Sequence, residues 1–178
     1  MTQHEYIFIA VSIILGLAIT RLLHTAAMIT RAQERVLFHW SSALWAFSVL
    51  LFILQLWWVG WGLRVIEDWT FFDFIVLVFG SIFIYGAAEM ALSAPDEEID
   101  MLEESQQFGR LSAIFMLLYF LIGPYVNIVM YNRPILLSLV FPSLGIALML
   151  LVIFFPKRFA MLSPLFALYA LLILSVTV

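Results

Sequence analysis

Six long apolar segments, separated by short polar breaks, constrain the fold of this chain more than any other feature. They run over residues 6–29, 37–63, 70–92, 111–131, 135–155 and 159–178. Each is close to the length of about 20 residues that a helix needs to cross the hydrocarbon of a bilayer. Because backbone polar groups find no water inside lipid, a spanning segment is either a helix or a strand of a closed barrel. The apolar runs are continuous rather than alternating, which excludes barrel strands.

Composition supports the same fold class. Hydrophobic residues make up 65% of the 178 residues and charged residues 11%, whereas about a quarter of a soluble domain is charged. We therefore predict an all-α membrane protein whose main partner is the lipid bilayer. The expected architecture is a single transmembrane domain over residues 1–178, a bundle of about six helices joined by short loops and by one longer acidic loop at residues 93–110.

The distribution of basic residues predicts the orientation. The first, third and fifth breaks hold five of them: Arg31, Arg35, Arg110, Lys157 and Arg158. The second and fourth breaks hold two, Arg64 and Arg133. Because cytoplasmic loops are enriched in Lys and Arg, this count predicts that the odd breaks are cytoplasmic and that both termini lie outside.

Charge, cysteine content and motifs exclude several classes of function. A formal charge of −4 leaves no basic patch for nucleic acid. The chain has no cysteine, so disulfides, thiolate nucleophiles and cysteine-based metal sites are excluded. It contains no glycine-rich phosphate loop, HExxH or GxSxG motif. We therefore predict a protein that is not an enzyme and that binds no metal.

Ionisable residues inside the spans are the strongest candidates for function, because each costs about 2.5–3.5 kcal/mol at mid-membrane and therefore usually faces the bundle interior. Four of them are expected at a similar depth near the inner face, and we name them the polar inner layer: Arg21, His24, His39 and Glu89. Either Arg21 and Glu89 pair only to fix the first helix against the third, or all four line a wet pocket that binds an anion, relays protons or holds a cofactor. Haem iron held by the two histidines is one form of such a cofactor site, and a zinc or copper ion at the same residues is another.

Two further groups of residues stand out in and beside the first three spans. Glu5, Arg64 and Asp73 form a shallower set at the outer face. Ser12, Gly16 and Thr20 recur every four residues along the first span, a spacing of small residues that allows close helix packing in lipid. This stripe is predicted to be a packing face.

The acidic loop is predicted to contain a short helix. Ser93 and Asp96, with Pro95 between them, fit a capping box at a helix start. Six acids follow: Asp96, Glu97, Glu98, Asp100, Glu103 and Glu104. Their interpretations are a solvated linker helix, a docking site for a basic partner, or a cation site, although the spacing does not match a calcium loop.

The first part of the chain is similar to a group of bacterial membrane proteins. Its motifs are Glu5-Tyr6, Ser12-Ile13, Gly16-Leu17 and Thr20 with Leu22-Leu23, followed by Trp40, Trp45, Gln55, Trp57-Trp58 and Trp69-Thr70-Phe71. These residues, spread over about positions 5–75, resemble the start of a large group of small, uncharacterised multi-pass proteins of the bacterial inner membrane. The resemblance implies that location and no activity, and it carries over no functional residue.

Three functions fit these observations. The first is a small channel or transporter-like protein, a homo-oligomer whose polar inner layer handles a proton, an ion or a small anion. The second is a non-catalytic accessory or scaffolding subunit of a larger membrane complex. The third is a membrane protein that binds haem or a quinone, for which aromatic, histidine-bearing bundles are suited.

Overall fold

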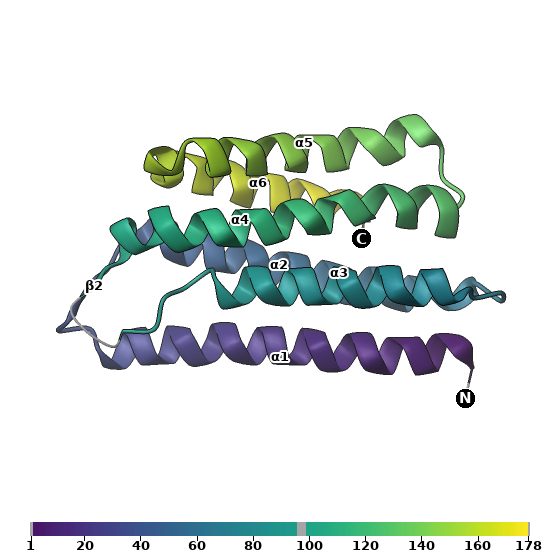
Figure 1. Cartoon of the computed structure of the whole chain (residues 1–178), viewed down its shortest axis with the longest axis horizontal. Helices are drawn as coiled ribbons and strands as arrows, with labels where there is room; N and C mark the ends of the chain where they lie inside the picture. The colour runs from purple at the N-terminus through teal and green to yellow at the C-terminus, as the bar shows by residue number, and fades with distance from the viewer. Residues whose placement is uncertain (1, 96–98, 178) are drawn as a thin grey trace.

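The computed structural model describes residues 2–95 and 99–177 and contains, within these ranges, six long helices (Figure 1). They are α1 (Gln3–Arg31), α2 (Trp40–Gly62), α3 (Phe71–Glu89), α4 (Met101–Tyr125), α5 (Ile135–Phe154) and α6 (Phe159–Thr177). All six are long and apolar enough to cross a membrane. The chain is therefore a multi-pass membrane protein with an all-α bundle, as the apolar segments predicted.

The helices lie side by side along one common direction, with α1 at one edge of the bundle and α5 at the other (Figure 1). α1 packs against α3 and α2, α4 lies between α3 and α5, and α2 packs against α6. Two-residue strands β1 (Val36–Leu37) and β2 (Ile99–Asp100) pair in parallel and join the α1–α2 connection to the α3–α4 connection.

Side chains at the helix starts explain where several spans begin. Thr2 and Glu5 form a capping box on α1, and Thr70 and Asp73 form one on α3. Such caps satisfy backbone N–H groups that have no partner within the helix. The Asp100 carboxylate accepts a hydrogen bond from the Leu102 N–H at 2.8 Å and so begins α4.

The centre of the core is aromatic and lies between α2, α4 and α6. The Trp45 ring lies 4.5 Å from the Phe166 ring, whose other neighbour, Phe52, is 5.5 Å away. The Trp45 indole donates a hydrogen bond of 2.9 Å to the Ser112 hydroxyl, which in turn donates one of 2.8 Å to the Ala87 carbonyl. This relay joins α2, α4 and α3 through side chains that are fully buried.

The acidic segment differs from its prediction. α4 begins at Met101, so residues 101–110, expected in the loop, form the first turns of a spanning helix. The cap is Asp100 rather than Ser93 with Asp96. Glu103 and Glu104 lie in the first turn, where negative charge is stabilised by the helix dipole. Asp96, Glu97 and Glu98 lie outside the described residues.

Candidate functional site

The structure brings together two members of the polar inner layer. The Arg21 Nε lies 2.8 Å from the Glu89 Oε2, an ion pair that joins α1 to α3. The two side chains are 36% and 29% exposed, so the pair lies at the border of the bundle rather than at its centre. This arrangement corresponds to the interpretation in which the ion pair fixes one helix against another.

The two histidines of the polar inner layer have different surroundings. His24 is exposed on α1. His39 is the N-cap of α2: its Nδ1 accepts a hydrogen bond of 3.3 Å from the Ser41 N–H and lies 2.6 Å from the Ser41 hydroxyl oxygen. Among the described residues no three histidine or acidic side chains are grouped as metal ligands. Haem ligation by His24 and His39 stays a prediction.

The outer polar residues serve three separate local purposes. Glu5 belongs to the cap of α1. The Arg64 guanidinium lies 3.5 Å from the centre of the Trp61 ring. Asp73 is buried, and its carboxylate accepts hydrogen bonds from the Thr70 hydroxyl at 2.6 Å and the Tyr125 hydroxyl at 2.7 Å. Asp73 therefore both caps α3 and ties it to α4.

The small-residue stripe of α1 is not the face that packs within this bundle. The buried face instead carries larger residues such as Val11, Leu15 and Leu22. A Cβ atom added to Gly16 would meet nothing within 4 Å, and Thr20 is exposed, with its hydroxyl donating to the Gly16 carbonyl. Thr20 is thus exposed and Ser12 and Gly16 are half-buried, and at Gly16 the predicted close packing does not occur between helices of this chain.

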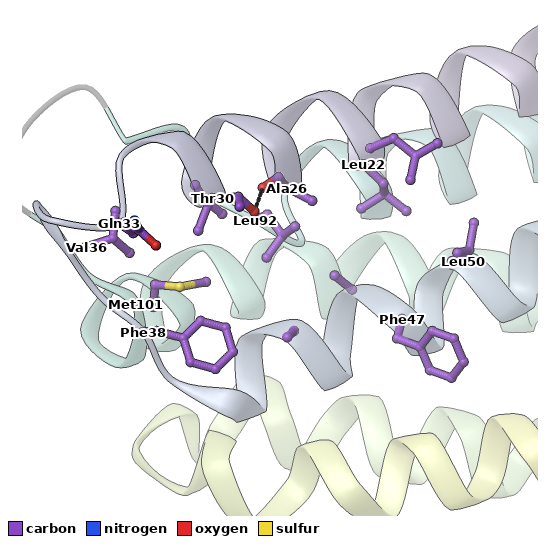
Figure 2. A pocket seen from close by; sticks show the side chains of 14 residues that line it. Leu22, Ala26, Thr30, Gln33, Val36, Phe38, Phe47, Leu50, Leu92 and Met101 are labelled. Carbon is purple, nitrogen blue, oxygen red and sulfur yellow. Dashed lines mark hydrogen bonds between the residues drawn. The ribbon is translucent and has the colours of Figure 1, made fainter.

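One apolar groove lies between the C-terminal half of α1 and the start of α2, and Figure 2 shows its lining side chains. Its volume is about 450 Å³. Hydrocarbon forms most of the wall, with Leu92 and Met101 contributed by the α3–α4 region. Of its polar side chains, the Thr30 hydroxyl is already bonded to the Ala26 carbonyl. Gln33 is therefore the main polar group that the groove offers.

A second cavity, of about 430 Å³, lies between α2, α3, α4, α5 and α6, and we name it the central cavity. Pro134 and Thr177 are at the end where α4 connects to α5, and Pro142 and Tyr169 are at the deeper end. Eight helical residues separate the two levels on α5 and on α6, which corresponds to a depth of about 12 Å. The walls are mainly apolar and aromatic, as is usual for small-molecule sites.

Four polar side chains that line the central cavity have no hydrogen-bonding partner among the described residues: Gln55, Tyr119, Asn127 and Arg133. The Gln55 Oε1 is fully buried. A buried acceptor without a partner costs about 1–3 kcal/mol, so a molecule that donates to Gln55 from within the cavity would recover this energy. Polar groups that converge on an apolar cavity are typical of a binding site.

The sequence of the α4–α5 connection explains how Arg133 comes to the mouth of the cavity. α4 ends in a π-helical turn over Val126–Met130, a wide turn that often occurs at functional sites. Asn132 then has φ 50°, a left-handed conformation that asparagine tolerates better than most residues. The Arg133 N–H bonds back to the Asn127 carbonyl at 2.9 Å. These features reverse the chain directly above the cavity.

Tyr131 fastens this connection to α2. Its hydroxyl donates a hydrogen bond of 2.8 Å to the Val59 carbonyl. Burial raises the pKa of Tyr131, and the positive charge of Arg133 opposes that rise. The Arg133 guanidinium lies 5.3 Å from the centre of the Tyr131 ring, within the range of a cation–π contact. The tyrosine therefore remains a hydrogen-bond donor and supports the arginine.

The deep end of the cavity depends on a close approach between α5 and α6. The Tyr169 hydroxyl donates a hydrogen bond of 2.9 Å to the Phe141 carbonyl. A Cβ atom on Gly145 would lie 2.6 Å from that hydroxyl oxygen and 2.9 Å from Phe120 Cδ2. Only glycine at this position leaves room for both rings.

Sequence reasoning did not identify the central cavity. The sequence identified Arg133 only as a basic residue of a short loop. Tyr119 and Tyr169 look like ordinary aromatic residues of apolar spans. One signal was present, namely the succession of Gly123-Pro124 and Asn127 in the fourth span, because proline interrupts a spanning helix and leaves carbonyls to be satisfied.

The fold places the chain in the class of six-helix membrane bundles, here with a mainly apolar cavity of about 430 Å³ between five of the helices. Comparison with known proteins adds no further identity. No protein-family model matches the chain, and neither curated proteins nor solved structures give a match.

Proposed function

We propose that this protein binds an amphipathic small molecule of the membrane in the central cavity. The observation that carries the proposal is the buried Gln55 Oε1, which finds no partner in the described part of the chain and lies at a mainly apolar cavity of about 430 Å³. Phe52, Leu77 and Phe141 would contact the apolar part of the ligand, and the unpartnered polar groups would orient its polar part. A binding role of this kind requires neither catalysis nor a metal.

This proposal is nearest to the third prediction, a membrane protein that binds haem or a quinone, rather than to that of a channel. The Arg21–Glu89 pair lies at the border of the bundle, whereas the central cavity lies between five helices and is lined by polar side chains without partners among the described residues. Transport of a proton, an ion or a small anion by an oligomer stays a prediction. The same holds for a location in the bacterial inner membrane with both termini outside.

Photolabelling tests the proposal. The protein, in nanodiscs of phosphatidylcholine, is irradiated with decanol that carries a diazirine, and labelled peptides are mapped by mass spectrometry. Label on the cavity-lining parts of α2, α5 and α6 supports binding. Val76→Phe places a ring in the cavity and should reduce this label at least about fivefold, because a filled site excludes the chain.

Val140→Phe is the matched control, because Val140 is 44% exposed on α5 and does not line the cavity. It should leave the label unchanged. Equal labelling of the wild-type protein and the Val76→Phe variant would refute binding in the central cavity.

An accessory or oligomeric role is the second candidate, and a different observation favours it. His24 is exposed in a span, and the nearby ion pair of Arg21 and Glu89 is about one-third exposed. Ionisable groups in membrane helices usually face protein rather than lipid. We propose that a further protein helix, from a second copy or from a partner, covers this face of α1.

Cysteine crosslinking tests that second candidate. The chain has no native cysteine, so His24→Cys introduces a single thiol. Oxidation in native membranes should give a disulfide-linked dimer if the second copy covers this face. The control Leu151→Cys places the thiol on an exposed position of α5 and should stay monomeric. Monomer from both variants would exclude the homo-oligomeric form of this candidate.

A further inference from the structure

We propose that the ligand of the central cavity carries an anionic group, a carboxylate or a phosphate, that binds Arg133 at the mouth. The inference rests on the proposed function and specifies the chemistry of the ligand. It follows from the charge, the partners and the position of this one arginine.

The charge of the cavity lining is one-sided. Arg133 lines the cavity, and no acidic side chain of the described residues does so. Asp73, the nearest buried carboxylate of this end of the bundle, is already bonded to Thr70 and Tyr125. Among the described residues, a molecule in the cavity therefore meets one positively charged side chain, at one end, and no acidic side chain.

Arg133 has no anionic partner of its own among the described residues. Its close ring contact is with Tyr131, 5.3 Å from the ring centre. Arg64, the other arginine at this end, differs, because it lies 3.5 Å over Trp61 and does not line the cavity. A guanidinium stays charged at physiological pH and matches the two oxygens of a carboxylate or phosphate. Arg133 thus has a free planar set of donors at the mouth.

The position of Arg133 suits an amphiphile. It lies in the connection between two spanning helices, where head groups and water meet, and the cavity extends about 12 Å from there along the helices. An anionic group at Arg133 stays in the polar layer while the apolar part enters the cavity. Asn127, at the same end and without a side-chain partner, offers a further amide donor.

Three photoprobes of equal length test the inference in the same nanodiscs: diazirine-bearing decanoic acid, decyl phosphate and decanol. At a pH at which the acid is ionised, at least one anionic probe should bind the wild-type protein about tenfold more tightly than the alcohol. Preference for the carboxylate assigns a free fatty-acid-like ligand, preference for the phosphate assigns a phospholipid-like head group, and preference for both assigns the shared anion chemistry.

Arg133→Gln should abolish the preference, so that the three probes bind this variant equally, and Arg64→Gln is the matched control that should keep the preference. Equal binding of all three probes to the wild-type protein, or a preference that survives Arg133→Gln, overturns the inference. These results differ from failure of the proposed function, in which no probe labels the cavity or Val76→Phe has no effect on any of them.

Discussion

Replacing Gln55 by leucine separates a binding role of this side chain from a structural one. The Gln55 Oε1 is buried and has no hydrogen-bonding partner among the described residues. An unsatisfied buried polar group costs about 1–3 kcal/mol, whereas an apolar group of similar shape avoids that cost. We therefore expect Gln55→Leu to raise the free energy of unfolding of the ligand-free protein, by about 1 kcal/mol at the lower limit of that range.

The same substitution should weaken ligand binding. A hydrogen bond between neutral groups contributes about 0.5–1.5 kcal/mol net, and 1.4 kcal/mol corresponds to a factor of ten in affinity. We expect Gln55→Leu to lower the affinity of the strongest-binding photoprobe by about threefold to tenfold. Stability and binding thus change in opposite directions, which a residue that only supports the fold would not produce.

The assay is equilibrium unfolding in mixed micelles, followed by tryptophan fluorescence, for delipidated protein with and without the probe. Gln33→Leu is the matched control, because Gln33 is exposed at the end of the α1–α2 groove, and it should change the unfolding free energy by less than about 0.5 kcal/mol. If Gln55→Leu destabilises the ligand-free protein by about 1 kcal/mol or more, the amide has a structural partner and the reasoning fails.

Three further substitutions test the packing. Ser112→Ala leaves the buried Trp45 indole N–H without its acceptor, so the unfolding free energy should fall by about 1–3 kcal/mol in the same assay. Gly145→Ala brings a methyl group to 2.6 Å from the Tyr169 hydroxyl oxygen and should destabilise by about 1–3 kcal/mol. Gly16→Ala meets open space and should instead stabilise α1 by about 0.5–1 kcal/mol; destabilisation by this third change would show that another helix covers Gly16 in the assayed protein.

The positions of the spanning helices could be predicted because lipid imposes a length and a composition that six segments satisfy. The start of α4 could not be predicted from local signals. Ser93 and Pro95 resemble a helix start. However, Ile99 and Asp100 are held extended because they pair in parallel with Val36 and Leu37, so α4 begins only after Asp100. That pairing joins segments far apart in the sequence, and no local pattern indicates it.

The buried face of α1 was not predictable from residue size. The span is apolar on most sides, so lipid and protein neighbours differ little in what they favour. The stripe with Gly16 looked suited to close packing, yet Leu15 and Ala18, both fully buried, form the contact. A choice between neighbouring faces depends on which helices are present, and this is a property of the assembled bundle.

The central cavity was hidden for a related reason. Five helices contribute to it, and each contributes residues that look ordinary in its own span. Gln55 and Arg133 share the cavity only because α2 and the α4–α5 connection reach the same end of the bundle. The aromatic residues at its deep end are of the types found in any buried core. They can be told apart from packing residues only when the helices that surround them are known.

The pairing of β1 with β2 has a consequence for biosynthesis. The two strands belong to connections that precede α2 and follow α3, so they meet only after both helices have left the ribosome and entered the membrane as a hairpin. If only one of the two helices inserted, the two strands would lie on opposite sides of the bilayer and could not pair. The β1–β2 pairing therefore requires that both α2 and α3 span the bilayer, and it stabilises this part of the topology once they do.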